Sequence, residues 1–380
     1  MNINSADVTH QGQVITQYRK AKKWSQEDLA EALHVDVRTV QRMEKQAMIK
    51  NINRRQLLIG LLGIPAALME LENELLHHTL KTPLVLNNDR MSFLEDEMST
   101  RWELYYTGGT LRAARSLDMW MNEVTLLAQS SQGTAWHSRT LALLAMSYQL
   151  QSCIARDMMD YDQAHRANRR AYHISQELDD PELLASALTR EGLTLIQQEK
   201  PIEAIKYLKG ALKTIHYLGL PTLKAYTLQG LSEAYAKAQQ AQECWQSIGQ
   251  LEHILGQREQ TTERSNTRLS IASVTAQKGI NAVLLHDHRR ALSLMDKSLI
   301  TYDPAFIRGR ARLLSQKAEA YYGLGYIDES VSIAEEALTL ARSIGANKTL
   351  ARVRTLHTTL LQSSWRKERS IAQLGAVLSL

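Results

Sequence analysis

Several residue types are scarce in this 380-residue chain, and each shortage excludes a class of protein. Only two cysteines occur, Cys153 and Cys244, far apart and outside any C-x-x-C spacing, which excludes a disulfide framework and a cysteine zinc site. We expect both to be small buried core residues. Because there are only two Phe and six Pro, and long β-branched runs with period two are missing, the composition predicts an all-α chain.

The chain also lacks a hydrophobic run long enough to cross a bilayer. The longest apolar stretch, from Leu57 to Met69, has 13 residues and is interrupted by Gly-Ile-Pro. The Arg54-Arg55 pair before it resembles a twin-arginine export signal, but it lies more than fifty residues into the chain, so buried helices explain the stretch better. The polar opening MNINSADVTHQGQ does not have the pattern of a signal peptide. We therefore expect a cytoplasmic protein without a membrane partner.

Motifs that mark common enzyme classes are missing as well. The sequence has no Walker-type GxxxxGK[ST], no G-x-S-x-G and no H-E-x-x-H. Its one dense histidine cluster, HDHRR from His286 to Arg290, is expected in a turn between two helices, where solvated polar residues are common. The His77-His78 pair falls in a connector. The sequence therefore predicts no enzyme, no cofactor and no metal site.

Positive charge is concentrated near the N-terminus. The formal net charge of the chain is +5. Residues 1–60 hold ten Lys or Arg against six Asp or Glu, a balance of +4, which leaves +1 for the remaining 320 residues. A basic N-terminal part followed by a near-neutral remainder predicts a polyanionic partner for the first part alone.

Residues 13–44 have the pattern of three short helices. Ser25 is a good N-cap for the second helix, with Asp28 at the capping-box position, and Asp36 caps the third. The apolar residues expected to face a common core are Val14, Ile15, Tyr18, Leu29, Ala30, Leu33, Val40 and Met43. Two short helices joined by a turn of a few residues make a helix-turn-helix, whose second helix can enter the major groove of DNA.

The stretch YRKAKKWSQEDLAEALHVDVRTVQRMEK resembles the helix-turn-helix of the Cro/C1 repressor class, also called XRE-type. The matching residues, at that family's spacing, are Arg19, Ser25, Gln26, Leu29, Ala30, Val35, Thr39, Val40 and Glu44. The resemblance implies an internal ion pair between Arg19 and Glu44, and a phosphate contact from Gln26. The base-reading positions that it implies are Val37, Arg38, Gln41 and Arg42.

Arginine and lysine are expected to contribute differently to DNA binding here. Arginine can donate two hydrogen bonds to guanine, worth about 1–3 kcal/mol of discrimination, whereas lysines beside the reading helix neutralise phosphates without reading sequence. The expected DNA contacts are Gln26, Val37, Arg38, Thr39, Gln41, Arg42, Lys45 and Lys50. The family usually has Gly soon after the Glu, but here EKQAMIKNINRR follows, so this loop must differ. Two further helices, expected at 53–62 and 65–72, would close a five-helix bundle.

Beyond residue 90 the sequence contains internal repeats. The clearest copy, from Ala311 to Ala341, resembles the tetratricopeptide pattern, with Ser330 in place of the usual Ala. Other copies carry small residues at the same offsets, namely Gly192, Ala204, Ala211, Gly279, Ala291 and Ser298. The repeats are expected to begin near residues 95, 145, 185, 225, 272, 311 and 351. Helix pairs of this kind stack into a right-handed superhelix with a concave surface.

Such a concave helical surface can bind a peptide or another protein. Counting along the first helix of each repeat, the side chains expected to face inward are Gln149, Arg156, Tyr226, Gln229, Glu233, Lys237, Arg312, Glu319 and Tyr322. Polar and aromatic side chains in a groove can hydrogen-bond to a peptide backbone and stack on its side chains. The alternative is that these are ordinary solvated or inter-repeat residues.

The predicted fold is all-α, with a five-helix bundle followed by a right-handed α-solenoid of tetratricopeptide-like helix pairs. We expect a flexible N-terminus at 1–12, a Cro/C1-type DNA-binding domain at 13–71 and a linker or hinge at 72–90. The repeat domain is expected at 91–380, where it would sense a ligand and form oligomers.

The combination of these two domains resembles the RRNPP group of peptide-sensing transcription regulators of bacteria. The resemblance implies a homodimer that binds double-stranded operator DNA through its first domain and a regulatory peptide through its repeats, as in quorum sensing. Two alternatives stay open. The repeats could bind a protein partner or only dimerise, or the chain could be a scaffold or adaptor with a vestigial or protein-binding helix-turn-helix. Arg38 and Arg42, with the charge confined to the first domain, argue against the adaptor.

Overall fold

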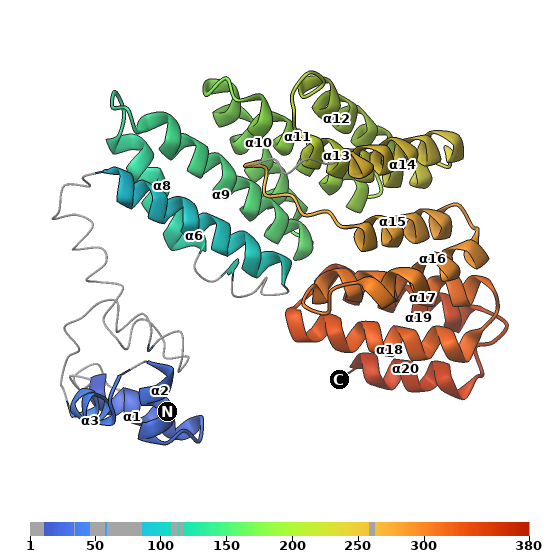
Figure 1. Cartoon of the computed structure of the whole chain (residues 1–380). Coiled ribbons are helices and arrows are strands. Elements are labelled where there is room, and N and C mark those ends of the chain that lie inside the picture. The colour runs from blue at the N-terminus through green and yellow to red at the C-terminus, as the bar shows by residue number, and fades with distance from the viewer. Residues whose placement is uncertain are drawn as a thin grey trace. The chain divides into compact units, whose positions relative to one another are not determined.

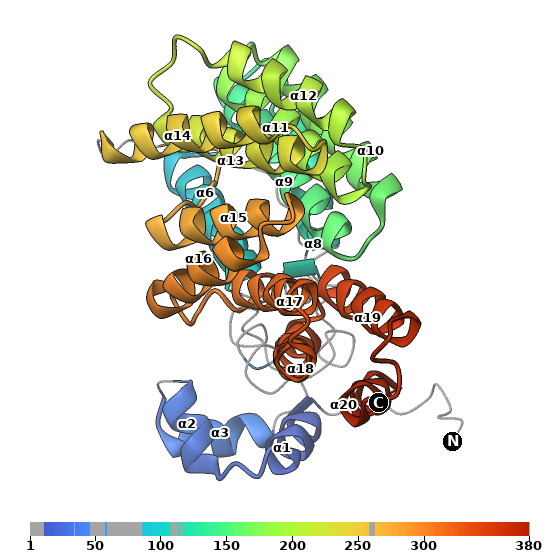
Figure 2. The same cartoon turned by 90° about the vertical axis from the view of Figure 1, so that its right-hand side faces the viewer.

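The computed structural model divides the chain into two compact units, Met1–Val85 and Leu86–Leu380 (Figures 1 and 2). It describes residues 11–33, 35–45, 58, 86–107, 113–114, 117–257 and 263–379. Every secondary-structure element within these ranges is a helix, so the predicted all-α class is confirmed. None of these helices combines the length and the apolar character that a membrane crossing needs.

The first unit contains three described helices, α1 (Gln11–Ala21), α2 (Gln26–Ala32) and α3 (Val37–Glu44). Ser25 and Asp28 form a reciprocal capping box at the start of α2, and the Asp36 carboxylate accepts a hydrogen bond from the Thr39 N–H at 3.0 Å. These caps fix the turn between the two helices. The buried core contains Val14, Ile15, Leu29, Ala30, Leu33, Val40, Met43 and Leu58.

Helix α1 begins earlier than the expected boundary at residue 13. Gln11 and Gly12 are helical and buried, because the bare Cα of Gly12 lies against the last turn of α3. A Cβ at Gly12 would lie 2.5 Å from the backbone oxygen of Glu44, so only glycine permits this approach. The helices expected at 53–62 and 65–72 lie outside the described residues, apart from Leu58, which is helical and fully buried.

The second unit is a series of helices that pack against their neighbours in sequence (Figure 1). Both α6 (Asn88–Tyr106) and α8 (Leu117–Ser130) pack on α9. Helix pairs then follow in order: α9 (His137–Asp157) with α10 (Tyr161–Glu177), α11 (Pro181–Gln197) with α12 (Pro201–Thr214), α13 (Pro221–Lys237) with α14 (Ala241–Gly256), α15 (Ile271–Leu284) with α16 (His288–Thr301), α17 (Ile307–Gly323) with α18 (Ile327–Ile344), and α19 (Asn347–Gln362) with α20 (Arg369–Ser379). Each expected repeat start falls inside α6 or the first helix of a pair.

Most turns between these helices share one backbone geometry. A residue in the left-handed region precedes the N-cap of the next helix, as at Met159 (φ 65°) and Glu199 (φ 60°). Gly325 (φ 80°) takes the same place before α18, and His286 (φ 63°) takes it before α16. His286 therefore lies in the turn, as predicted, Asp287 caps α16, and the remaining three residues of the HDHRR cluster begin this helix.

Small residues allow close packing within the pairs. A Cβ at Gly192 would lie 2.6 Å from Leu208 Cγ, so α11 and α12 are in contact at this glycine. Ser330, which stands where the repeat pattern usually has alanine, is fully buried and donates a hydrogen bond of 2.8 Å to the backbone oxygen of Ala318. The Ser330 hydroxyl is therefore satisfied, so this departure from the pattern leaves no unpaired hydroxyl at residue 330.

Both cysteines are buried core residues, as expected from the sequence. Cys244 is fully buried on α14, and burial raises the pKa of its thiol to about 12. A thiol with this pKa is protonated at neutral pH, which argues against a reactive role.

The expected linker at 72–90 lies mainly outside the described residues. Its end belongs to the second unit, because Asn87 caps α6 by accepting a hydrogen bond of 2.9 Å from the Arg90 N–H. Residues 88–90 are therefore helical rather than part of a hinge.

Candidate functional site

Helix α3 is held in place by a buried polar cluster at its C-terminal end. Arg19 of α1 donates to both carboxylate oxygens of Glu44, at 2.6 and 3.3 Å, and to the backbone oxygen of Trp24 at 2.7 Å. Gln26 of α2 donates to the same carboxylate at 2.5 Å. Because Arg19 is only 7% exposed, this ion pair is shielded from water and ties α1, α2 and α3 into one rigid body. The Gln26 amide, expected at a phosphate, lies on Glu44 here.

The outer face of α3 consists of long polar side chains. Arg38, Gln41 and Arg42 are exposed, and Lys45 follows at the C-cap. Val37 is half-buried, and Thr39 turns inward, where its hydroxyl donates to Asp36 at 3.0 Å. Lys50 lies outside the described residues.

The Asp36 carboxylate caps the start of α3 and places a negative charge there. The Thr39 N–H and hydroxyl, followed by the nearby Arg38, hold the pKa of the Asp36 carboxyl below its ordinary value. With Val37 and Arg42, these residues line a shallow hollow. The helix thus presents two arginines and a glutamine from a fixed position, which is the geometry that base reading needs.

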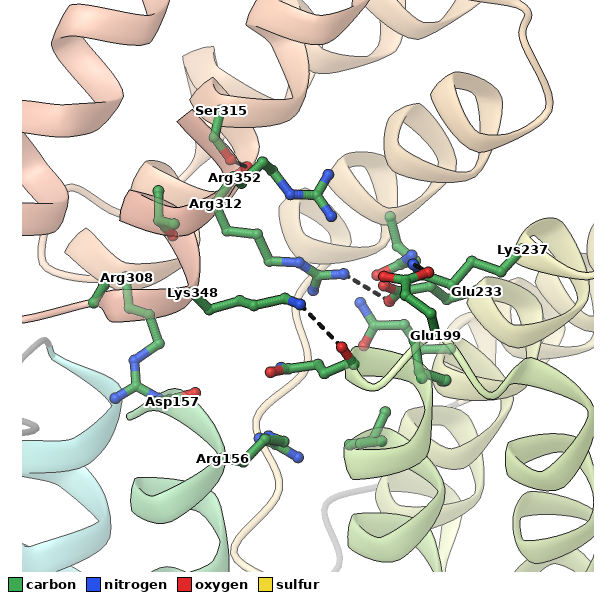
Figure 3. Close-up of a pocket in the computed structure, with 18 of the residues that line it drawn as sticks. Arg156, Asp157, Glu199, Glu233, Lys237, Arg308, Arg312, Ser315, Lys348 and Arg352 are labelled. Atoms are coloured by element: carbon green, nitrogen blue, oxygen red, sulfur yellow. Dashed lines mark hydrogen bonds and ion pairs between the residues drawn. The ribbon is translucent and has the colours of Figure 1, made fainter. Parts of the chain in front are cut away.

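In the second unit a groove runs along the first helices of the pairs (Figure 3). Its residues come from α9, α11, α13, α15, α17 and α19. Its cavity volume is about 160 Å³, below the roughly 300–1,000 Å³ typical of pockets that enclose a small ligand. An occupant would therefore lie along the groove with much of its surface exposed.

Six of the nine residues expected to face inward line this groove, namely Arg156, Tyr226, Gln229, Glu233, Lys237 and Arg312. Four of these are on α13 and share one face of the helix. Glu319 contributes indirectly, because it accepts a hydrogen bond of 3.0 Å from the groove residue Arg352.

The other two expected residues have different surroundings. Gln149 is buried between α9 and α11, where it donates to the Leu183 backbone oxygen and accepts from Ser186 and Arg190. Tyr322 packs edge-on against Trp365, with ring centroids 6.3 Å apart. Both residues therefore hold helices together rather than lining the groove.

Four ion pairs cross or border the groove. Arg312 lies 2.6 Å from Glu233 and Lys237 lies 2.5 Å from Glu199. The other two pairs are Arg308 with Asp157, and Arg352 with Glu319. Three of these pairs join different helices, and Lys237 of α13 pairs with Glu199 in the turn before α12, so the charges link neighbouring parts of the array.

An extended segment, residues 263–270, connects α14 to α15 and lies across earlier helices of the unit (Figure 1). Ser265 is fully buried, its N–H donates to Glu182 at 2.8 Å, and its backbone oxygen accepts from Arg190 at 2.7 Å. The next residue, Asn266, accepts a hydrogen bond from Tyr106 at 2.6 Å. The segment therefore ties α6 and α11 together from within the unit.

Several groove residues were not identified from the sequence, among them Asp157, Arg308, Lys348 and Arg352. Asp157, Arg308 and Lys348 lie at the ends of helices, where counting along a repeat pattern is least certain. The extended segment 263–270 was missed too. Its only signal was the longer spacing between the repeats expected to begin near 225 and 272.

Comparison with known proteins places the two units in context. Residues 15–67 match the family model described as helix-turn-helix. The chain matches no sequence among curated proteins.

Solved structures match over a larger part of the chain. A Rap protein complexed with Competence and Sporulation Factor has a TM-score of 0.55 and 14% identity, covering 86% of this chain and 85% of its own. PlcR of Bacillus thuringiensis, in complex with the peptide PapR7 and DNA, has a TM-score of 0.41 and 14% identity, covering 90% of this chain and 98% of its own. BtubC of P. vanneervenii has a TM-score of 0.43 and 15% identity, covering 60% of this chain and 92% of its own. The chain therefore carries an N-terminal helix-turn-helix domain of the Cro/C1 type, followed by helix pairs packed as in the Rap protein.

Proposed function

We propose that this chain is a sequence-specific DNA-binding transcriptional regulator whose helical repeats bind a regulatory peptide and mediate dimerisation. The observation that carries the proposal is the outer face of α3, where Arg38, Gln41 and Arg42 are exposed on a helix fixed by the buried Arg19–Glu44 pair. Each arginine placed against a guanine edge contributes about 1–3 kcal/mol of discrimination. The basic balance of residues 1–60 adds attraction to phosphates.

The peptide part of the proposal is supported by the groove of the second unit. Tyr226, Gln229 and the neighbouring ion pairs offer donors, acceptors and an aromatic face along one open channel. The Rap structure, which has the same fold, is a complex with Competence and Sporulation Factor, so this arrangement of helices is compatible with ligand binding.

The small size of the proposed DNA-reading surface supports the proposal of a dimer. One helix of eight residues makes few base contacts, so two copies reading a two-fold-related site gain affinity and specificity together. A ligand in the groove can regulate such a dimer only if it binds one arrangement of the two copies more tightly than another.

Footprinting of the full chain on the DNA upstream of its own gene tests this proposal. We expect two protected half-sites with centres about 10 base pairs, or a multiple of this, apart at near-physiological salt. A single protected half-site would contradict the dimer. Protection that disappears with added salt, or that is equal on unrelated DNA, would show phosphate attraction alone and contradict a sequence-specific regulator.

A further inference from the structure

The charges that line the groove do not balance. The lining cations are Arg156, Lys237, Arg308, Arg312, Lys348 and Arg352. The lining carboxylates are Asp157, Glu199 and Glu233, and Glu319 pairs with one cation from beside the groove. Four of the six cations are thus in ion pairs, and two, Arg156 and Lys348, form none with a described residue.

Arg156 is the more unusual of these two, because it is a buried charge. Arg156 lies near the C-terminal end of α9, and only 6% of its surface is exposed. One nitrogen lies 3.4 Å from the Tyr105 hydroxyl, while Nε and Nη1 have no hydrogen-bond partner among the described residues. The adjacent carboxylate, Asp157, is paired with Arg308.

The surroundings of Arg156 add to this excess of positive charge. Arg190 is fully buried nearby on α11 and bonds to Gln149, Cys153 and the Ser265 backbone oxygen, none of which is charged. A buried cation is costly because it gives up its hydration, and the carboxylate nearest to Arg156, that of Asp157, is shared with Arg308. A bound anion would remove that cost.

A second feature of the groove points to the same ligand chemistry. Lys348, half-buried at the start of α19, makes its one described hydrogen bond to the Gln197 backbone oxygen at 3.0 Å (Figure 3). Burial, followed by the nearby Arg352, lowers the pKa of its ammonium, as expected for a cation lacking a counter-charge. The N-cap of α19 is Ala346, which has no side-chain acceptor for the first-turn N–H groups. The positive end of this 16-residue helix therefore lines the groove.

We propose that the groove binds a carboxylate of its peptide ligand, held by the free Nε and Nη1 of Arg156 and attracted by Lys348 and the start of α19. Guanidinium nitrogens match the two oxygens of a carboxylate in geometry, so the buried arginine provides an anchor and a direction for the peptide. The carboxylate is either the C-terminus of the peptide or an Asp or Glu side chain. This inference rests on the proposed peptide binding, and it specifies the chemistry of the ligand.

Four pools of random, N-acetylated heptapeptides test the proposal on the full chain. Two pools end in a free acid and two in an amide, and each ending is made with and without Asp and Glu in the mixture. Peptides retained by immobilised protein are quantified by mass spectrometry. We expect retention from the free-acid pool that contains Asp and Glu and from one of the two pools with a single source of carboxylate, and none from the amide pool without Asp and Glu.

The comparison between pools identifies the source of the carboxylate. Retention of the free-acid pool lacking Asp and Glu assigns the C-terminus, and retention of the amide pool containing them assigns a side chain. Equal retention of the carboxylate-free pool would overturn the inference while peptide binding stood. If no pool is retained, the inference and the peptide part of the proposed function both fall, and the DNA footprint still tests the first unit separately.

Two variants test the proposed roles of Arg156 and Lys348 in binding the carboxylate. Arg156→Met should weaken carboxylate-dependent retention by about 30-fold or more, and it should raise the Tm of the ligand-free protein because it removes a buried unpaired charge. Lys348→Gln should weaken retention less, and gives a second test if Arg156→Met does not fold. The control Arg90→Met, at a surface pair with Glu123, should change neither result. A lower Tm for Arg156→Met with unchanged retention would assign the arginine a purely structural role.

Discussion

Glu233 shows how single residues set the charge of the groove. It is buried on α13, and its carboxylate accepts a hydrogen bond of 2.6 Å from Arg312. Burial alone would raise the pKa of this carboxyl, but the charge and hydrogen bond of Arg312, with Lys237 nearby, hold the pKa below its ordinary value. The ionised Glu233 carboxylate therefore stabilises the folded state.

We predict that Glu233→Gln lowers the free energy of unfolding by about 1 kcal/mol at pH 7, a modest value because Arg312 is partly exposed. The folded pKa is depressed, so the contribution is complete above the ordinary carboxyl pKa of about 4.3 and is lost as pH falls through the lower folded value. Urea denaturation between pH 7 and 3 should show wild type and variant converging only below about pH 4. A difference that stays constant down to pH 3 would rule out the carboxylate charge as its cause.

At the same scale, some residues were predictable from local spacing and others were not. Ser25 and Asp36 cap helices because N-caps depend on residues three positions away, which a sequence displays directly. Gln149 was expected in the groove but lies between α9 and α11, because the rotation of one helix against its neighbour decides between these two positions. A one-dimensional pattern does not contain that rotation.

At the scale of elements, the pairing of α11 with α12 depends on one glycine. A Cβ at Gly192 would lie 2.6 Å from Leu208 Cγ and 3.3 Å from the Ala204 backbone oxygen, and both residues are fully buried. Gly210, on α12 of the same pair, has nothing within 4 Å of the position of a Cβ. The two glycines therefore lie in the same helix pair, but Gly192 is tightly packed and Gly210 has open space around it.

We predict that Gly192→Ala destabilises the protein by about 1–3 kcal/mol, because the two helices must move apart. Gly210→Ala should stabilise it by about 0.5–1 kcal/mol, because alanine reduces the conformational freedom of the unfolded chain. Thermal denaturation of the two variants beside wild type measures both effects. Shifts of the same sign would contradict the packing described for this pair.

The regular elements were more predictable than the connection that departs from them. The repeat starts expected near 185, 225 and 311 fall in α11, α13 and α17, since small residues recur wherever two helices must approach closely. The segment 263–270 follows no such rule. Its contacts join Ser265 to residues more than seventy positions earlier, and no local pattern encodes a contact of that range.

At the scale of the whole molecule, a helix-turn-helix unit precedes an array of helix pairs with a charged groove. The sequence predicted both parts, because the first rests on spaced residues in a short segment and the second on repetition. The excess positive charge of the groove was not predictable. It arises where the ends of α9, α17 and α19 meet, and only the folded array brings their cations together.

The measurement that tests the central claim most directly is the ratio of affinities for the chain's own upstream DNA and for unrelated DNA. It should be made by fluorescence anisotropy at near-physiological salt, where phosphate attraction is weaker than at low salt. Three proteins should be compared: wild type, Arg38→Ala/Arg42→Ala, and Lys20→Ala/Lys45→Ala. The last pair removes the same charge from exposed positions that are not expected to read bases.

We predict that wild type prefers its own DNA and that Arg38→Ala/Arg42→Ala reduces this preference by about 30-fold or more, because two base-reading side chains are lost. Lys20→Ala/Lys45→Ala should weaken binding to both DNAs alike and keep the ratio. A wild-type ratio near one, or a preference that survives the loss of both arginines, would contradict a regulator that reads DNA through α3.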